Sequence, residues 1–111
     1  MKNIAILIDN SSSSKKIIGN HTLLGFQIEA IKKMVSYLHS DKNIFVSIYS
    51  YGDEYGCRLT RSNDTKKINN VLQNITIIGD AHLLKCFRFA KLGHHDKIIC
   101  FSAKNMTKTQ M

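Results

Sequence analysis

The sequence of 111 residues contains no proline, no tryptophan and only three cysteines. Without proline, its turns must depend on glycine, asparagine and aspartate. The cysteines are Cys57, Cys86 and Cys100, and their odd number without any C-x-x-C pair argues against a disulfide framework. We therefore predict three free thiols that are buried or half-buried.

Long apolar runs are also missing. The apolar run at residues 4–8 is far too short to span a membrane, and no signal-peptide cleavage pattern accompanies it. With 43% hydrophobic residues, the chain can form one domain with one modest core. We expect a soluble cytoplasmic or nuclear domain over residues 1–103, a polar tail at residues 104–111, and no membrane partner.

Sequence signatures of catalysis are absent as well. The chain has no nucleophile elbow, no phosphate-binding glycine loop and no metalloprotease helix. No acid, base and nucleophile assemble at a recognisable spacing. We therefore expect no enzyme activity, and the alternative is a small α/β enzyme that uses Asp9 as its catalytic carboxylate.

The net charge of +8 raises the question of nucleic-acid binding. Of the 16 basic residues 13 are lysines, and they stand in scattered pairs such as Lys15-Lys16 and Lys66-Lys67. No arginines alternate with aromatic residues in the manner that supports base stacking. Specific nucleic-acid recognition is therefore not expected, and a basic ribosome- or RNA-associated protein stays open as an alternative function.

Four segments have the composition of strands. Each is a continuous apolar run or is rich in β-branched and aromatic residues, namely residues 4–8, 44–49, 57–60 and 97–102. The first and last are typical of strands buried on both faces of a parallel sheet, and Cys100 would be a core residue there. Residues 11–19 are predicted to form a polar loop.

Apolar residues at helical spacing predict three helices. The first begins near Thr22, buries one apolar face and places Gln27 on the opposite, polar face. The turn at residues 62–64 supplies an N-cap for a second helix, which contains residues 68–75. A third helix carries Cys86 in a buried position and ends at Gly93.

These elements predict an α/β fold with the order β-α-β-β-α-α-β. Right-handed crossovers favour a mostly parallel sheet of order 3-2-1-4, with strand three as an antiparallel edge and helices on both faces. Ligands of such sheets bind at the carboxyl end of strand one, where strand four lies beside it. That position is occupied by Asp9.

Asp9, Ser11 and Ser13 spell D-x-S-x-S directly after the first strand. One carboxylate and two hydroxyls at this spacing can hold a hard cation such as Mg²⁺. The alternative, which we favour, is that Asp9 accepts backbone N–H groups in the loop, because a strong Mg²⁺ site needs more hard oxygen ligands. We therefore expect no cofactor.

Histidines and aspartates elsewhere could suggest a second metal or acid-base site. His94-His95-Asp96 is predicted to be the solvated loop before the last strand. His82 is predicted to be a loop or cap residue at the start of the third helix.

Three segments carry a resemblance to a known family, namely the I-D-N-S sequence at residues 8–11, the helix segment at residues 27–30 and the V-S-I-Y-S-Y-G-D run at residues 46–53. They resemble the von Willebrand A domain of the ubiquitin-receptor subunit in the 26S proteasome regulatory particle. The similarity continues at low identity through residues 97–102 and so covers nearly the whole chain.

The resemblance implies a truncated von Willebrand A (Rossmann-like) domain that serves as a non-catalytic structural subunit. In the family this domain bridges the lid and base of the regulatory particle and contacts the deubiquitinase subunit. No ubiquitin-interacting helix follows here, so ubiquitin binding is not expected. Metal-binding relatives carry a threonine and an aspartate at the places of His82, or its neighbours, and Ala103, so the metal motif is degenerate. A von Willebrand A subunit of a transcription and repair complex is a further alternative.

The last predicted strand would stand at an edge of the sheet. Its apolar side chains and unpaired backbone groups would then be exposed. We predict that a partner subunit covers this edge, formed by Ile98, Ile99, Cys100 and Phe101.

Overall fold

The computed structural model describes residues 2–38 and 41–103, and the predicted polar tail at 104–111 lies outside them. A four-stranded sheet of order β5-β4-β1-β6 forms its centre, with β1 Lys2–Ile8, β4 Ile44–Ser50, β5 Gly56–Ser62 and β6 Lys97–Cys100. The strand β1 pairs in parallel with β4 and β6, and β5 runs antiparallel to β4. The predicted sheet order and its antiparallel edge strand are confirmed.

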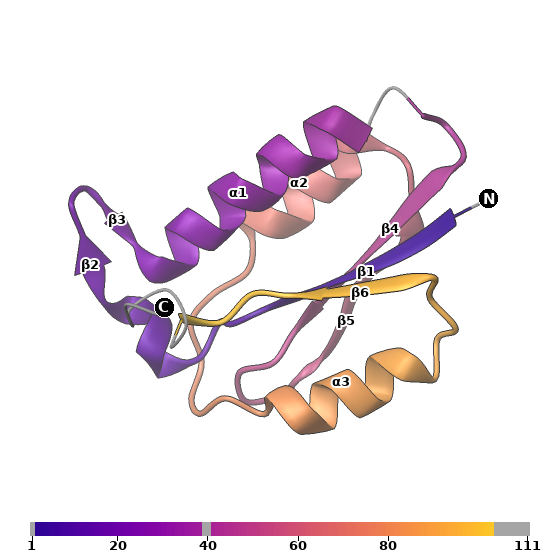
Figure 1. Ribbon diagram of the computed structural model, residues 1–111. Helices are drawn as coiled ribbons and strands as arrows, with labels where there is room; N and C mark the ends of the chain where they lie inside the picture. Colours follow the sequence, from indigo (N-terminus) through magenta and orange to yellow (C-terminus); the bar gives the residue numbers. More distant parts are fainter. Residues whose placement is uncertain (1, 39–40, 104–111) are drawn as a thin grey trace, which may run out of the picture.

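Helices cover both faces of the sheet, as predicted (Figure 1). On one face lie α1, Leu23–Leu38, and α2, Thr65–Gln73, and on the other lies α3, Leu83–Lys91. None of the helices in the described part of the chain is long and apolar enough to cross a membrane.

The side chains of the continuous apolar run in β1 point alternately to the two faces of the sheet. Ile4, Ile6 and Ile8 pack under α1 and α2, in a cluster that includes Ile31 and Leu72. Alternate residues of the same strand face α3 instead, where Ala5 and Leu7 join Tyr49, Tyr51, Cys86 and Ala90. A strand with helices on both faces needs apolar residues at every position, which explains its sequence.

The N-terminus of α2 confirms the predicted cap. The Asp64 side chain accepts hydrogen bonds from the backbone N–H groups of Lys66 and Lys67. The helix ends at Gln73, so Ile75, which the periodicity placed in it, follows the helix and packs against the core from the loop.

The segment predicted as a polar loop after β1 contains regular structure instead. A 3₁₀ turn, η1 Ser12–Lys15, leads into a two-stranded ribbon of β2, Ile17–Ile18, and β3, His21–Thr22. Gly19 has a φ of +63°, which suits a glycine in the tight turn between the two strands. Figure 1 shows this ribbon extending beyond the carboxyl end of the sheet.

Two of the three cysteines differ from the prediction. Cys86 is fully buried on α3, but Cys57 on β5 and Cys100 on β6 are exposed. Both exposed cysteines lie on the outermost strands of the sheet, which within residues 2–38 and 41–103 have a neighbouring strand on one side only. The prediction that β6 is buried on both faces is therefore wrong, because an edge strand with few helix contacts cannot bury every side chain.

Candidate functional site

Asp9 ends the buried run of β1, and only 2% of its surface is exposed. Its Oδ1 accepts hydrogen bonds from the backbone N–H and the hydroxyl of Ser11, at 3.0 and 2.5 Å. Its Oδ2 accepts one from the backbone N–H of Ala103, at 2.9 Å. Burial of a carboxylate is costly unless such donors surround it. Asp9 therefore ties the segment after β6 to the loop after β1.

Gln27 of α1 holds the backbone of Asp9. Its Oε1 accepts a hydrogen bond from the Asp9 N–H at 2.8 Å, and its Nε2 donates one to the Asp9 carbonyl at 2.9 Å. Gln27 is fully buried, so its predicted position on the polar face of the helix was wrong. Leu23 and Ile31 stand four residues before and after it and are also buried, so helical spacing was the signal that could have found it.

Asn10 joins two further loops to the end of β1. Its Oδ1 accepts a hydrogen bond from the Gly52 N–H at 2.7 Å, and its Nδ2 donates one to the Thr76 carbonyl at 2.8 Å. A Cβ at Gly52 would lie 2.5 Å from the Ile78 carbonyl oxygen. The loop after β4 approaches its neighbours so closely that only glycine fits.

Tyr51 lies beside Asp9 at the same end of the sheet. Its hydroxyl donates a hydrogen bond to the carbonyl of Phe101, and only 1% of the residue is exposed. Burial and, second, the neighbouring Asp9 carboxylate raise the pKa of the Tyr51 hydroxyl. Tyr51 therefore stays protonated at neutral pH and acts as a fixed donor to the segment after β6.

His82 stands at the N-cap position of α3, as predicted, although its side chain does not cap the helix. Its Nε2 lies 2.8 Å from Oδ1 of Asp53, in the loop after β4. This hydrogen bond lowers the pKa of Asp53. His82 thus connects the start of α3 to the loop after β4.

Ser13, the third residue of the D-x-S-x-S sequence, is exposed in η1. It borders a shallow depression of about 270 Å³, lined by residues 11–13 and 79–81. Only one carboxylate, that of Asp9, belongs to the D-x-S-x-S sequence, and both of its oxygens already accept hydrogen bonds. In residues 2–38 and 41–103, no three His, Cys, Asp or Glu side chains group together as metal ligands would. Mg²⁺ prefers an octahedral set of oxygens with carboxylates among them, so these residues do not fit a resident Mg²⁺ ion.

The loop before β6 contains one residue that is not solvated as predicted. His94 and Asp96 are exposed, but His95 is half-buried and its Nε2 lies 3.0 Å from the Tyr49 hydroxyl. Burial raises the pKa of Tyr49 to about 12. Burial and the nearby Arg61 guanidinium lower the pKa of His95. The pair is a neutral contact between β4 and the loop before β6.

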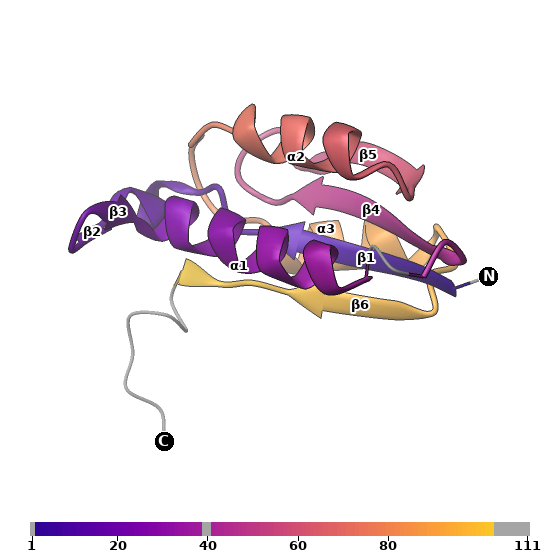
Figure 2. The same cartoon turned by 90° about the horizontal axis from the view of Figure 1, so that it is seen from above.

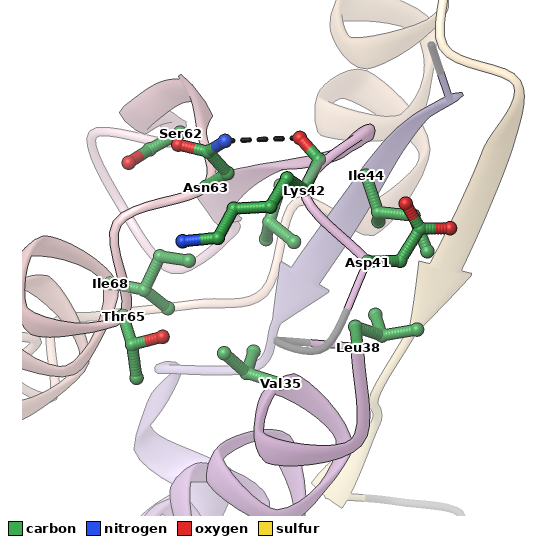
Figure 3. A pocket seen from close by; sticks show the side chains of 10 residues that line it. Val35, Leu38, Asp41, Lys42, Ile44, Ser62, Asn63, Thr65 and Ile68 are labelled. Atoms are coloured by element: carbon green, nitrogen blue, oxygen red, sulfur yellow. Dashed lines mark hydrogen bonds between the residues drawn. The ribbon is translucent and has the colours of Figure 1, made fainter.

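A cavity between the end of α1 and the start of α2 is shown in Figure 3. Val35 and Ile68 line it, and beside it the Asn63 side chain donates a hydrogen bond to the Lys42 carbonyl at 3.1 Å. Its volume is about 10 Å³, which is room for a single water molecule. The cavity is too small to be a ligand site.

The predicted partner-binding edge is an edge of the sheet in the described part of the chain. β6 pairs with β1 and has no strand on its other side, where Figure 2 shows it along the border of the molecule. Cys100 is exposed, and Ile98, Ile99 and Phe101 are half-buried. The apolar side chains of this edge differ from the side chains of Asp9, Asn10 and Gln27, which form hydrogen bonds within the chain.

Comparison with known proteins gives matches of structure alone. No protein-family model matches the sequence, and no curated protein matches it. Among solved structures, the SpRpn10 VWA domain matches with a TM-score of 0.74 and 17% identity, over 97% of this chain and 62% of that chain. The conserved hypothetical protein BatB from Bacteroides thetaiotaomicron matches with a TM-score of 0.77 and 15% identity, over 90% of this chain and 52% of that one. The PilB minor pilin from Streptococcus sanguinis has a TM-score of 0.76 and 17% identity, over 92% and 30% of the two chains.

These similarities establish the fold. The chain has an α/β von Willebrand A fold with a mostly parallel central sheet, in a small form that spans about 62% of the SpRpn10 chain. Pilins and other von Willebrand A proteins share the fold to the same degree, so the fold by itself does not select one biological role.

Proposed function

We propose that this chain is a non-catalytic protein-binding subunit that bridges the lid and base of the proteasome regulatory particle. The observation that carries the proposal is the open edge at β6, where Cys100 is exposed and Ile98 is only half-buried. An apolar strand with an unpaired edge is a ready site for contact with another chain. The half-buried apolar side chains and the unpaired backbone of this edge suit it to permanent assembly with partner subunits.

The loops at the carboxyl end of the sheet support a non-catalytic role. A catalytic carboxylate must reach substrate, whereas Asp9 is 2% exposed and accepts hydrogen bonds from Ser11 and Ala103. Gln27, Asn10 and Tyr51 likewise use their polar atoms to join segments of this chain. The place where α/β sheets usually bind ligands is here occupied by hydrogen bonds that stabilise the domain.

The resemblance of residues 8–11 and 46–53 to the proteasomal von Willebrand A domain supports the choice of complex. The match to the SpRpn10 VWA domain over 97% of this chain agrees with that choice. Within the proposal, the partners are lid and base subunits including the deubiquitinase subunit, in the cytoplasm and nucleus. No bound Mg²⁺ and no direct binding of ubiquitin are part of this function.

The test is affinity capture of the tagged chain from its native cells at mild salt, followed by mass spectrometry. The proposal predicts that lid and base subunits co-purify in constant ratio to the chain. The net charge of +8 favours a second candidate, a ribosome- or RNA-associated protein. Recovery of ribosomal proteins with RNA and no proteasome subunits would overturn the proteasomal role in favour of that candidate.

A further inference from the structure

The two faces of the sheet are unequally covered. α1 and α2 share one face, whereas in the described part of the chain α3 is alone on the other, where it packs on β1, β4 and β5 (Figure 1). A helix is about 10 Å across and strands lie about 4.8 Å apart, so one helix does not fully cover a four-stranded sheet. On the α3 side, β6 lies at the margin of the helix, where Ile98 packs partly against the cluster beneath it.

Apolar side chains line the uncovered area. Phe89 of α3 contacts Tyr49 of β4, with ring centroids 6.0 Å apart, which fixes that flank of the helix toward β4. The opposite flank consequently faces β1 and β6. We group the apolar side chains of this flank and those that β6 presents on the same side of the sheet as the α3–β6 face, which consists of Leu83, Leu84, Phe87, Ile98 and Cys100.

The exposure of this face is high for apolar residues. Leu84 is 61% exposed and Leu83 is 37% exposed. Cys100 is exposed, and Phe87 and Ile98 pack only partly against the cluster beneath α3. Partly exposed apolar side chains beside an incompletely covered sheet face leave room for a further helix in a layered α/β fold.

The charges around the face are positive. α3 carries Lys85, Arg88 and Lys91 and no carboxylate. The Lys91 ammonium lies 5.7 Å from the centre of the Phe87 ring, which places it at the rim of the α3–β6 face. A second copy of this chain would bring a further charge of +8 to the contact, so self-association is disfavoured.

We propose that an acidic amphipathic helix of a partner protein packs on the α3–β6 face, beside α3 and over β6. Its apolar stripe would cover Leu84, Phe87 and Ile98, and its carboxylates would face Lys91. This inference rests on the proposed function as a protein-binding subunit and specifies the partner segment. It does not depend on which complex contains the chain.

The exposed cysteines provide an internal test. Cys100 lies in the α3–β6 face, whereas Cys57 lies on β5 at the opposite edge of the sheet. The complex captured from cells and the purified chain are each treated with iodoacetamide, and the alkylation rate of each thiol is measured by mass spectrometry. We expect complex formation to slow the alkylation of Cys100 about tenfold relative to that of Cys57, since a packed helix excludes the reagent. An unchanged ratio of the two rates would overturn the inference.

Two substitutions of exposed aliphatic residues test the charge and position of the contact. Leu84→Glu places a carboxylate in the α3–β6 face, and Ile17→Glu makes a comparable change on the β2–β3 ribbon, where Ile17 is 68% exposed. We expect Leu84→Glu to reduce partner recovery about tenfold and Ile17→Glu to leave it unchanged. Lys91→Glu is a second variant, at the rim of the α3–β6 face. Thermal unfolding verifies that all three variant chains fold. Full recovery with both Leu84→Glu and Lys91→Glu would contradict the inference.

Photo-crosslinking identifies the segment that covers the face. A chain with Cys57→Ser carries a benzophenone on Cys100, and a chain with Cys100→Ser carries it on Cys57 as the matched control. The inference predicts that only the Cys100 probe attaches to one acidic segment with apolar residues at helical spacing. Attachment to an extended strand or a basic segment would contradict it. Such a result, with lid and base subunits still captured, would leave the proposed function intact, whereas an acidic helix from another complex would support the inference and overturn the proteasomal role.

Discussion

The Gln27 side chain forms hydrogen bonds with both backbone groups of Asp9, through Oε1 to the N–H at 2.8 Å and through Nε2 to the carbonyl at 2.9 Å. The amide thus forms hydrogen bonds with the backbone just after β1, as the neighbouring strands do with the backbone of β1 itself. It also fixes α1 to the loop that carries Ser11 and Ser14. The carboxyl end of this sheet is consequently a hydrogen-bonded junction between α1, β1 and the segment after β6.

Replacement of Gln27 tests the importance of that junction. Gln27→Leu keeps the side-chain volume but leaves the buried Asp9 N–H without its acceptor, so we expect a loss of about 2 kcal/mol in the free energy of unfolding. Urea unfolding measures this loss. Gln73→Leu, at the exposed end of α2, is the control and should change stability by less than about 0.5 kcal/mol. Equal effects of the two substitutions would contradict the role given to Gln27.

Gly52 and Gly56 form a matched pair for the close packing of the loops. A Cβ at Gly52 would lie 2.5 Å from the Ile78 oxygen and 2.8 Å from Oδ1 of Asn10, whereas a Cβ at Gly56 would meet nothing within 4 Å. We expect Gly52→Ala to destabilise the fold by about 2 kcal/mol through overpacking, and Gly56→Ala to have little effect. Thermal unfolding of both variants separates the two cases, and a harmless Gly52→Ala would show that the loops lie further apart.

His95 should make stability depend on pH. Burial and Arg61 hold its pKa below the ordinary value of 6.5, so the unfolded chain binds this proton more readily than the folded chain. The stabilisation is present in full above pH 6.5 and is lost as the pH falls from there through the lower pKa of the folded state. His95→Gln should flatten this part of the pH profile of unfolding. A profile unaffected by His95→Gln would show that other groups cause the acid sensitivity.

The three thiols should differ in reactivity in the isolated chain. Cys57 and Cys100 are exposed, whereas Cys86 is fully buried and burial raises its pKa to about 12. We expect a thiol reagent to modify two cysteines in the folded chain and the third only after unfolding. Rapid reaction of all three thiols under native conditions would contradict the packing of α3 on the sheet.

Binding of Mg²⁺ can be tested by the unfolding temperature. Because the Asp9 oxygens already accept three hydrogen bonds, we expect Mg²⁺ and a chelator to give the same unfolding temperature within about 1 °C. A ligand that binds only the folded state would raise it. An increase in the unfolding temperature with Mg²⁺ that disappears in the Ser13→Ala variant would establish a metal site at the D-x-S-x-S sequence.

The sequence contained enough information for the order of the sheet. Residues 4–8 form a continuous apolar run because β1 lies between two strands and two helix layers, and the handedness of crossovers then restricts the topology. The β2–β3 ribbon was missed because Ile17 and Ile18 are exposed and show no buried face. The burial of Gln27 depends on a partner 18 residues away, and the exposure of Cys100 depends on which strand stands at the edge. The exposure of an edge strand is a property of tertiary contact that local periodicity does not contain, whereas the helical spacing of Leu23 and Ile31 did indicate the burial of Gln27.

The most direct test of the central claim compares two exposed positions in one capture experiment. The account places partner binding on the α3–β6 face and gives no binding role to the D-x-S-x-S loop. Ser13→Ala should therefore recover lid and base subunits as well as the unchanged chain, whereas Leu84→Glu should lose most of them. Loss of the partners with Ser13→Ala and normal recovery with Leu84→Glu would contradict the account and place the function at the loop after β1.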